Sequence, residues 1–413
     1  MRIAVVTVGC RTNRAESEEM ESILAESGHE IVRDGDSPDV VILNTCTVTA
    51  KADAQCRQIV RKAVGSGVRV IATGCAVELN KHSLSEAFPQ VEFFGNMSKD
   101  SIVKILKPHT SCSASIFLPQ RHRPILKVQE GCDNTCSYCI IPKVRGASRS
   151  VPLETILDQA KKIEEGGFRE VVLSGIHLGQ FGKDHNPPLT LADLVDMLLD
   201  NVQHCRLRLS SLEVNEVDDR ILARMADRQL CCHLHIPLQS GDDNILIKMN
   251  RAYSTQAYGA CIEKISALVP GVSIGADVIV GFPGEDESSF CKTYEFIESL
   301  PLAYLHVFAF SPRKGTPAAK MSNRVPLNIV KERSRRLRLM GNRMKSAFIQ
   351  SQIGRTLDAV VESRNEKCYV ATTGNFIRLA FDAPDDIRHG SLVSVRLVEA
   401  GGSIPRADLV TMM

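Results

Sequence analysis

Short apolar segments alternate with amphipathic helical segments along most of this 413-residue chain. In the first hundred residues, buried strands are predicted at 3–8, 40–44 and 69–73, with helices at 15–26 and 51–64 between them. Strands that alternate with helices in this way pair in parallel within one sheet. The beginning of the chain therefore predicts an α/β domain built on a parallel sheet.

The same alternation resumes in the middle of the chain, and we expect a partial TIM-like barrel of six βα units there. Functional residues in such barrels lie on loops at the carboxyl ends of the strands. A long helix is predicted to follow at 327–349, and residues 352–413 then contain only short strands separated by turns. The expected barrel strands are 125–129, 171–174, 206–210, 233–236, 273–280 and 304–308, and the later ones are 356–362, 368–372, 377–380 and 392–397.

Three cysteines lie in the loop after the predicted strand 125–129. Cys132, Cys136 and Cys139 have the spacing C-x3-C-x2-C. Three thiolates can hold three irons of a four-iron cluster and leave the fourth iron open for chemistry. A structural zinc site is the alternative, but such sites take four ligands, commonly from paired C-x2-C units, and no second pair follows here.

A second set of three cysteines follows the predicted strands of the first domain. Cys10, Cys46 and Cys75 each lie within two residues of the end of one of these strands. Because the carboxyl ends of parallel strands share one edge of a sheet, we expect the three thiols to lie near one another. The alternative is that each is a buried free thiol. Three thiols at one edge favour a ligand set, again with no evident fourth ligand.

Composition restricts the cellular setting and the charge of any RNA site. The N-terminus lacks the pattern of a secretory leader, and no segment approaches the ~20 apolar residues of a membrane helix. We therefore expect a cytoplasmic protein without membrane contact, in which the 14 cysteines serve as metal ligands or free thiols. The net charge of +2 says nothing about nucleic acid, so any RNA site must be a local patch.

Such a patch is predicted near residues 324–345, where eight Arg or Lys residues accompany one acidic residue. Apolar residues recur there at helical spacing, so a long helix with a basic face is expected. A solvated helix surface is the alternative, but the charge imbalance favours contact with a polyanion. The candidate RNA-binding residues are Arg333, Arg335, Arg336, Arg338, Arg343 and Lys345.

Four short motifs occur in order: residues 8–13 (VGCRTN), 43–49 (LNTCTVT), 73–75 (TGC) and the central cysteine triad. Together they resemble the methylthiotransferase family of radical S-adenosylmethionine (SAM) enzymes, over essentially the full length. The resemblance implies an N-terminal domain at 1–118, a radical SAM core at 119–350 and a TRAM domain, a small β-barrel, at 351–413. It implies two 4Fe–4S clusters, an auxiliary one on Cys10, Cys46 and Cys75 and the radical SAM cluster on Cys132, Cys136 and Cys139.

The resemblance also implies the reaction and its partners. The residues flanking Cys10 and Cys46 are most similar to those of enzymes that place a methylthio group on C2 of N6-threonylcarbamoyladenosine, at position 37 in the tRNA anticodon loop. In the family, one SAM methylates a cluster sulfur and a second gives the 5′-deoxyadenosyl radical, which requires an electron donor such as a flavodoxin or ferredoxin and a sulfur source. The same chemistry on isopentenyladenosine-37 or on an aspartate of a ribosomal protein remains open, as does a non-catalytic iron–sulfur RNA-binding protein.

Matching the family places candidate SAM contacts on the barrel loops. Each of these residues could instead have a purely structural role. Ser211 could cap a helix, Glu213 could face solvent, Gln239 could brace its loop, and the glycines could serve only as turn residues. His233 and His235 face the same side of their strand, and hydrogen-bonded barrel histidines are favoured there over a metal site. The candidate cofactor-binding residues are Tyr138, Ser174, Gly175, Ser211, Glu213, Gln239, Asp277, Ile279, Gly281 and Phe282.

Overall fold

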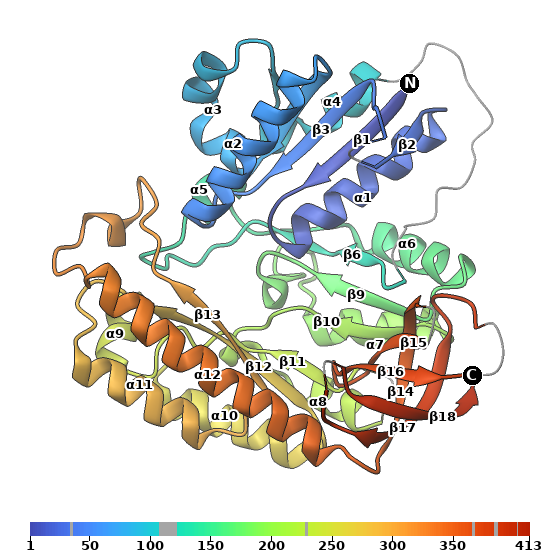
Figure 1. The fold of residues 1–413 in the computed structure, drawn as a ribbon, viewed down its shortest axis with the longest axis vertical. Coiled ribbons are helices and arrows are strands. Elements are labelled where there is room, and N and C mark those ends of the chain that lie inside the picture. The colour runs from blue at the N-terminus through green and yellow to red at the C-terminus, as the bar shows by residue number, and fades with distance from the viewer. Residues whose placement is uncertain (34–35, 107–121, 228–229, 366–367, 384–386, 403) are drawn as a thin grey trace. The chain divides into compact units, whose positions relative to one another are not determined.

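The structure is a computed structural model that describes residues 1–33, 36–106, 122–227, 230–365, 368–383, 387–402 and 404–413. They form two compact units. Figure 1 colours the chain from its N-terminus in blue to its C-terminus in red. The predicted domain boundary at 118/119 lies outside the described residues. Unit 1 comprises Met1–Gln120, Glu130–Arg149 and Ser311–Thr316, and unit 2 comprises Arg121–Gln129, Ser150–Phe310 and Pro317–Met413.

Unit 1 contains a five-stranded sheet in the order β2-β1-β3-β4-β5, with every neighbouring pair parallel. The parallel sheet predicted from the sequence is thus confirmed, and its three main strands begin and end within one residue of the expected positions. The strands are β1 (Arg2–Thr7), β2 (Glu30–Val32), β3 (Val40–Thr45), β4 (Arg69–Gly74) and β5 (Glu92–Phe93).

Helices cover both faces of this sheet because successive strand side chains point to opposite sides. Ile42 packs in one core with Leu24 of α1 and Ile102 of α4. Leu43 packs in the other core with Val60 of α2. The helices are α1 (Arg11–Glu26), α2 (Ala50–Gly65), α3 (Cys75–Ala87), η1 (Asn96–Ser98), α4 (Lys99–Leu106) and α5 (Ile141–Arg145).

Unit 2 begins with six parallel strands, as the sequence predicts. They form two three-stranded sheets, β10-β9-β6 and β11-β12-β13. Isolated bridges from Leu207 to Leu230 and from Ser211 to His235 link the two sheets into one partial barrel. The strands are β6 (Ile125–Lys127), β9 (Glu170–Ser174), β10 (Arg206–Leu209), β11 (His233–His235), β12 (Ser273–Val280) and β13 (Tyr304–Ala309), and the short strands β7 (Gln129–Glu130) and β8 (Arg149–Ser150) lie where the chain passes between the units.

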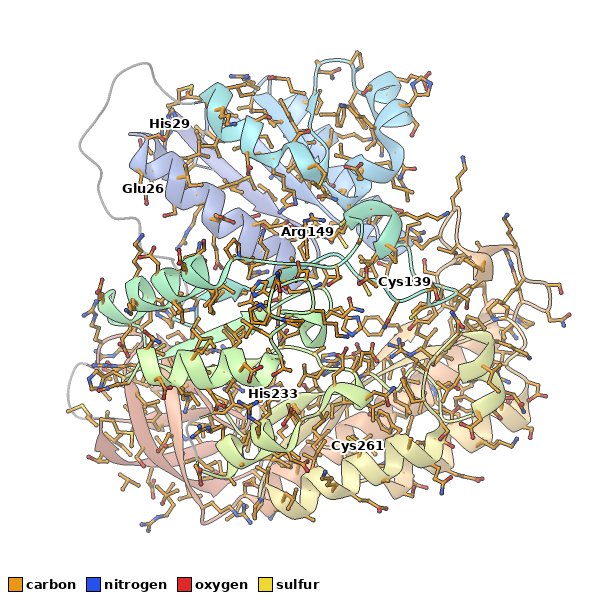
Figure 2. The ribbon with its side chains drawn as sticks, turned by 180° about the vertical axis from the view of Figure 1, so that it is seen from behind. Glu26, His29, Cys139, Arg149, His233 and Cys261 are labelled. Atoms are coloured by element: carbon orange, nitrogen blue, oxygen red, sulfur yellow. The ribbon has the colours of Figure 1, made fainter. Side chains whose placement is uncertain are left out.

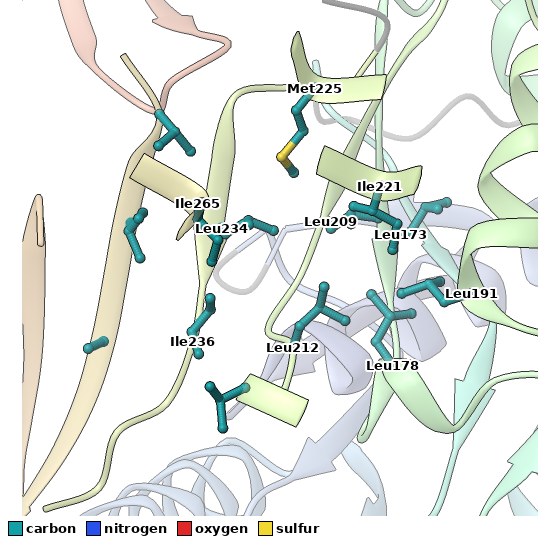
Figure 3. Packing of buried hydrophobic residues seen from close by; sticks show 14 of the residues in the cluster. Leu173, Leu178, Leu191, Leu209, Leu212, Ile221, Met225, Leu234, Ile236 and Ile265 are labelled. Carbon is teal, nitrogen blue, oxygen red and sulfur yellow. The ribbon is translucent and has the colours of Figure 1, made fainter. Parts of the chain in front are cut away.

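The barrel core is formed by apolar side chains from the strands and the surrounding helices. Leu173, Leu209 and Leu234 lie in one buried cluster with Ile221 of α8 and Ile265 of α10 (Figure 3).

None of the described helices combines the length and apolarity needed to cross a bilayer. The helices are α6 (Leu153–Glu165), η2 (Leu178–Gln180), α7 (Leu191–Asn201), η3 (Val214–Glu216), α8 (Asp219–Ala226), α9 (Asp243–Lys248), α10 (Thr255–Leu268), α11 (Glu287–Ser299), η4 (Pro317–Lys320) and α12 (Leu327–Ser351).

The C-terminal segment of unit 2 is a small closed β-barrel in the order β14-β15-β16-β18-β17, closed by pairing of β17 with β14. Four of its strands were expected, but β18 was not. Its apolar Val410 and Met412 are exposed, so its local pattern does not mark a buried strand; pairing with the distant β16 and β17 holds it. The strands are β14 (Thr356–Arg364), β15 (Tyr369–Thr373), β16 (Arg378–Asp382), β17 (Leu392–Glu399) and β18 (Arg406–Met412).

Buried charges join the small barrel to the amino ends of the large barrel's strands. Arg208 donates from Nε to Glu170 Oε1 at 2.7 Å and from Nη2 to the Thr373 carbonyl at 2.9 Å. The Phe376 ring of the small barrel packs at a tilt against His233, with ring centroids 4.5 Å apart. This closure lies at the end of the barrel opposite the loops that carry the candidate cofactor residues.

Candidate metal and cofactor sites

The N-terminal cysteine triad lies at the carboxyl edge of the unit 1 sheet. Cys10, Cys46 and Cys75 follow β1, β3 and β4, which are direct neighbours in the sheet. A Cβ built on Gly9 would lie 2.9 Å from Cys46 Sγ, so the loop carrying Cys10 runs closely past Cys46. Cys46 and Cys75 are buried, and Cys10 is exposed. The predicted gathering of the three cysteine-bearing loops is therefore present.

Side chains from the flanking motifs bind the three loops together. Asn13 Nδ2 donates to the carbonyls of Val8 at 2.9 Å and Thr45 at 2.8 Å, which joins the first two loops. Thr45 Oγ1 donates to the Thr73 carbonyl at 2.5 Å, which joins the second loop to the third. The polar residues beside the cysteines thus fix the loops through buried hydrogen bonds rather than facing solvent.

Gly74 allows the third loop to approach the second. Its φ is +98°, and a Cβ at this position would lie 2.4 Å from the Thr45 carbonyl oxygen. We expect Gly74→Ala to lower the free energy of unfolding of unit 1 by about 1–3 kcal/mol and to reduce its iron content. Denaturant unfolding and iron counting measure both effects.

Gly65→Ala is the matched control, because Gly65 has no heavy atom within 4 Å of a built Cβ and a φ that alanine adopts readily. This control should retain all its iron and be unchanged or slightly more stable. Equal behaviour of the two variants would contradict the close approach of the loops at Gly74.

The donor set at this edge fits a metal centre that prefers thiolates. Burial raises the pKa of the Cys46 thiol to about 12. Burial also raises the pKa of Cys75, against the opposing influence of the nearby Arg145 guanidinium. Both thiols are therefore protonated at neutral pH until a metal displaces the protons. Soft thiolate ligands select iron–sulfur clusters or zinc over hard cations such as Mg²⁺.

The second triad lies in a loop that backbone contacts close. The Cys132 amide donates to the Gly146 carbonyl at 3.1 Å, and the Ser148 amide donates to Asp133 Oδ1 at 2.8 Å. Gly131 has a φ of +72°, and a Cβ there would overlap the Ala147 carbonyl at 1.9 Å. All three thiols are partly exposed, and Tyr138 lies between two of them. Three accessible thiols on one closed loop fit a cluster with an open iron.

This second loop belongs to unit 1, although its neighbours in the chain form the large barrel. Cys139, labelled in Figure 2, is followed by Ile140 and then by α5. Ile140 and Val144 form one buried cluster with Cys75, the first residue of α3. The helix that follows the second triad therefore packs against a cysteine of the first triad. Sequence reasoning did not find this contact, which joins residues far apart in the chain.

Two buried serine hydroxyls mark the carboxyl ends of neighbouring strands in unit 2. Ser174 ends β9 and Ser210 follows β10, and the Ser210 amide donates to the Leu173 carbonyl at 3.0 Å. Neither Oγ atom has a hydrogen-bond partner among the described residues. A buried hydroxyl without a partner costs free energy, so a polar ligand at this end of the barrel would satisfy both. Ser174 was a predicted SAM contact, and Ser210 was not.

The other predicted SAM-contact residues on these loops differ in their solvent exposure and in their side-chain partners. Gly175 lies close to Gln129, whose Oε1 accepts from the His177 amide at 2.8 Å. Ser211 is exposed. Glu213 is the N-cap residue of η3 and forms an ion pair with Arg251, so its carboxylate does not point freely into solvent.

Gln239 has left-handed backbone geometry, with a φ of +68°. Two backbone hydrogen bonds hold this residue. The Gln239 amide donates to the Asp277 carbonyl at 2.8 Å, and the Gln239 carbonyl accepts from the Ile279 amide at 2.9 Å. Strained geometry of this kind is concentrated at functional sites, and here the neighbouring strand β12 imposes it.

A polar cluster of side chains links β11, β12 and β13 of the large barrel. His235 Nε2 lies 2.7 Å from Asp277 Oδ1, and His306 Nδ1 lies 3.2 Å from the same oxygen. Burial opposes ionisation of Asp277, but the hydrogen bonds from His235 and His306 lower its pKa to about 2. The Tyr304 hydroxyl is hydrogen-bonded to both His233 and His235, so both histidines have partners in the large barrel. The sequence did not reveal that Asp277 would join them.

Most of the predicted SAM-contact residues at the end of β12 are buried. Phe282 is fully buried and packs edge to face on Phe310, with centroids 5.4 Å apart. Gly281 is buried beside Val330, and its amide donates to Glu285 Oε2 at 3.1 Å. Ile279 remains partly exposed. Within this stretch, only Ile279 and Asp277 retain surface that a ligand can reach without rearrangement.

The basic helix α12 is present as predicted, but its cations differ in role. Arg333 is buried and pairs with Glu285 at 2.7 Å and Glu287 at 2.9 Å, so it stabilises the packing of α12 and is closed to RNA in this structure. Arg336 lies over the Phe290 ring at 4.7 Å. The candidates that remain exposed are Arg335, Arg338, Arg343 and Lys345, of which Arg335 also pairs with Glu332.

Two known protein families match different parts of the chain. The family described as Radical SAM superfamily matches residues 126–297, and the family described as Uncharacterized protein family UPF0004 matches residues 2–95. A solved radical S-adenosylmethionine methyltransferase, TsrM from Kitasatospora setae, shares the fold with a TM-score of 0.56, at 12% identity over 77% of each chain. The barrel and the three-cysteine loop are thus those of a radical SAM protein, which binds SAM and a 4Fe–4S cluster.

Full-length relatives define the family more closely. The Threonylcarbamoyladenosine tRNA methylthiotransferase MtaB of Bacillus subtilis is 32% identical over 97% of this chain and 94% of its own. The MtaB of Aquifex aeolicus is 34% identical over 96% of this chain and 100% of its own. A tRNA-2-methylthio-N(6)-dimethylallyladenosine synthase of Novosphingobium aromaticivorans is 31% identical over 96% and 95%. The chain belongs to the tRNA methylthiotransferase family.

Proposed function

We propose that this protein installs a 2-methylthio group on N6-threonylcarbamoyladenosine at position 37 of tRNA. The observation that supports the proposal is that one compact unit contains two sets of three cysteines, Cys10, Cys46 and Cys75 in the first and Cys132, Cys136 and Cys139 in the second. One three-thiol site serves any radical SAM reaction. A second supports sulfur transfer, and the relatives named MtaB support this nucleoside as the target.

Each triad would hold one 4Fe–4S cluster. When bound, the cluster on Cys132, Cys136 and Cys139 together with SAM supplies a 5′-deoxyadenosyl radical, and the cluster on the N-terminal triad supplies sulfur. The chain's own residues position these groups. In unit 2, the Ser174 and Ser210 hydroxyls would donate to a polar ligand at the carboxyl ends of β9 and β10, because they have no other partner among the described residues.

The tRNA would be bound through its phosphates and its anticodon loop. Position 37 lies in a single-stranded loop, so the adenine is reachable without opening a duplex. Arg335, Arg338, Arg343 and Lys345 on the exposed face of α12 would contact phosphates. The reaction also needs an electron donor such as a flavodoxin or ferredoxin, and a sulfur source that restores the N-terminal cluster.

The test is mass spectrometry of tRNA nucleosides from cells with and without the gene. Deletion should remove the 2-methylthio form of threonylcarbamoyladenosine and leave the 2-methylthio form of isopentenyladenosine unchanged. Plasmid-borne wild-type protein should restore the lost nucleoside, and the Cys10→Ala variant should not. An unchanged level of 2-methylthio-threonylcarbamoyladenosine in the deletion strain would exclude the proposed target.

Isopentenyladenosine at position 37 is the second candidate target, because a relative named for dimethylallyladenosine is 31% identical over nearly the whole chain. The same nucleoside profile separates the two. Loss of the methylthio form of isopentenyladenosine alone would assign the protein to that target while leaving the chemistry unchanged.

A further inference from the structure

Arg145 is the last residue of α5, six positions after Cys139, and its side chain is fully buried. Each of the five guanidinium N–H groups of an arginine can donate one hydrogen bond. In Arg145 all five have an acceptor. Nη1 donates to Glu16 at 2.6 Å and Glu130 at 2.8 Å, Nη2 donates to Asn13 Oδ1 at 2.5 Å and Glu16 at 3.2 Å, and Nε donates to Cys75 Sγ at 3.4 Å.

The sulfur of Cys75 is the acceptor that stands out. Four of the five N–H groups meet oxygen atoms, and the remaining one meets a cysteine of the N-terminal triad. A neutral thiol is a weak acceptor, whereas a metal-bound thiolate makes a much stronger, charge-assisted hydrogen bond. The Nε contact therefore gains most of its strength once Cys75 becomes a metal ligand.

Asn13 extends the reach of Arg145 to the other two ligand loops. Its Oδ1 accepts from Arg145 and lies 3.7 Å from Cys10 Sγ. Its Nδ2 donates to the carbonyls of Val8 and Thr45, which lie just before Cys10 and Cys46. One guanidinium thus contacts Cys75 directly and supports the Cys10 and Cys46 loops through a single amide side chain.

We propose that Arg145 is the positioning residue of the N-terminal cluster site: it holds the three ligand loops together and places a buried positive charge beside the Cys75 sulfur. The helix that follows the radical SAM cysteines then shapes the other cluster. This inference rests on the proposed second cluster and deepens it by naming the residue that stabilises its charge.

A buried cation beside a cluster affects both its affinity and its reduction. Partners that hydrogen-bond a metal ligand typically account for about 10- to 100-fold in metal affinity. Hydrogen bonds to cluster sulfurs and nearby charge also set the reduction potential. A fixed positive charge favours the reduced state, which carries one more negative charge. Removing it should weaken iron retention and shift the potential to more negative values.

The N-terminal site is measured alone in a full-length background in which Cys132, Cys136 and Cys139 are all alanine. In this background we compare Arg145→Met with the parent after anaerobic reconstitution. The measurements are iron release to a ferrous chelator and the reduction potential by EPR-monitored titration. We expect iron retention about 10- to 100-fold weaker and a negative shift of the potential. Neither readout requires turnover.

Arg149→Met is the matched control, because Arg149 lies in the same segment and pairs with Glu130 but donates to no cysteine among the described residues. It should match the parent in both measurements. Arg145→Lys keeps the charge and loses the forked geometry, so it should retain less iron than the parent and show a smaller potential shift than Arg145→Met. Glu16 remains paired with Lys99 when Arg145 is changed, which favours folding of the variants.

The outcomes separate this inference from the proposed function. No iron in the triple-alanine background would refute the second cluster itself. Iron that is bound equally tightly, at an unchanged potential, in Arg145→Met would overturn the role of Arg145 and leave the second cluster intact. If Arg145→Met does not fold, unchanged retention and potential in Arg145→Lys would overturn it in the same way.

Discussion

Alanine at Cys132 is expected to remove about half of the iron from the reconstituted protein and to abolish reductive cleavage of SAM, because it leaves only two thiols at the radical SAM site. Alanine at Cys10 should also remove about half of the iron, but SAM cleavage should persist. Both variants should lose methylthiolation of tRNA. Iron counting, detection of 5′-deoxyadenosine and nucleoside mass spectrometry measure the three properties.

The two variants give a diagnostic pattern because the same loss of iron accompanies opposite effects on SAM cleavage. Cys261→Ala is the control: this thiol of α10, labelled in Figure 2, lies 3.7 Å from the Val214 carbonyl and belongs to neither triad. It should retain all iron and all activity. Two results would contradict two independent three-thiol sites. One is that Cys10→Ala retains as much iron as the wild type. The other is that Cys10→Ala loses SAM cleavage although its Cys132, Cys136 and Cys139 site still holds all its iron.

Alanine at Glu170 is expected to give the largest loss of stability in unit 2. This carboxylate is fully buried and pairs with Arg206 at 2.7 Å, Arg208 at 2.7 Å and Arg123 at 3.5 Å. Removing it leaves buried arginines without their counter-charge, which typically costs about 3–5 kcal/mol. The denaturant midpoint of unit 2 should fall accordingly. Glu165→Ala, at the exposed end of α6, should change stability by less than about 0.5 kcal/mol.

The same carboxylate should make stability depend on acid pH. Burial opposes ionisation of Glu170, but Arg208 and Arg206 outweigh it and hold its pKa well below the usual range. Its contribution is therefore complete above the ordinary carboxyl pKa and is lost as the pH falls below it. Glu170→Gln should be less stable than wild type at neutral pH, and the difference should shrink in acid. A pH-independent difference would contradict an ionised Glu170.

Local pattern was sufficient for most strands and helices. Apolar periodicity is a property of neighbouring residues, so the strands ending before Cys10, Cys46 and Cys75 and the helix α12 lie close to where the sequence places them. The edge rule for parallel sheets then brought three distant cysteines together without any knowledge of their contacts. The strand β18 escaped prediction because long-range pairing, rather than its own pattern, makes it a strand.

Charged residues were harder to interpret, because the sequence does not say whether a charge is buried. Arg333 belongs to a basic run, yet it is buried against Glu285, whereas Lys345 in the same run is exposed. Arg208 and Glu170 appear in ordinary strand segments and prove to be a buried ion pair. Burial of a charge depends on which distant elements cover it, and only the packed structure supplies them.

The sequence by itself determined the two cysteine triads, the parallel sheet, the six-stranded barrel and the family, since each is encoded by spacing or by short-range periodicity. Only the tertiary structure decided that the loop of Cys132, Cys136 and Cys139 belongs to unit 1, that Arg145 reaches Cys75, and that Asp277 joins His235 and His306. These contacts join residues from distant parts of the chain. They exist because buried polar groups must find partners wherever the fold brings them together.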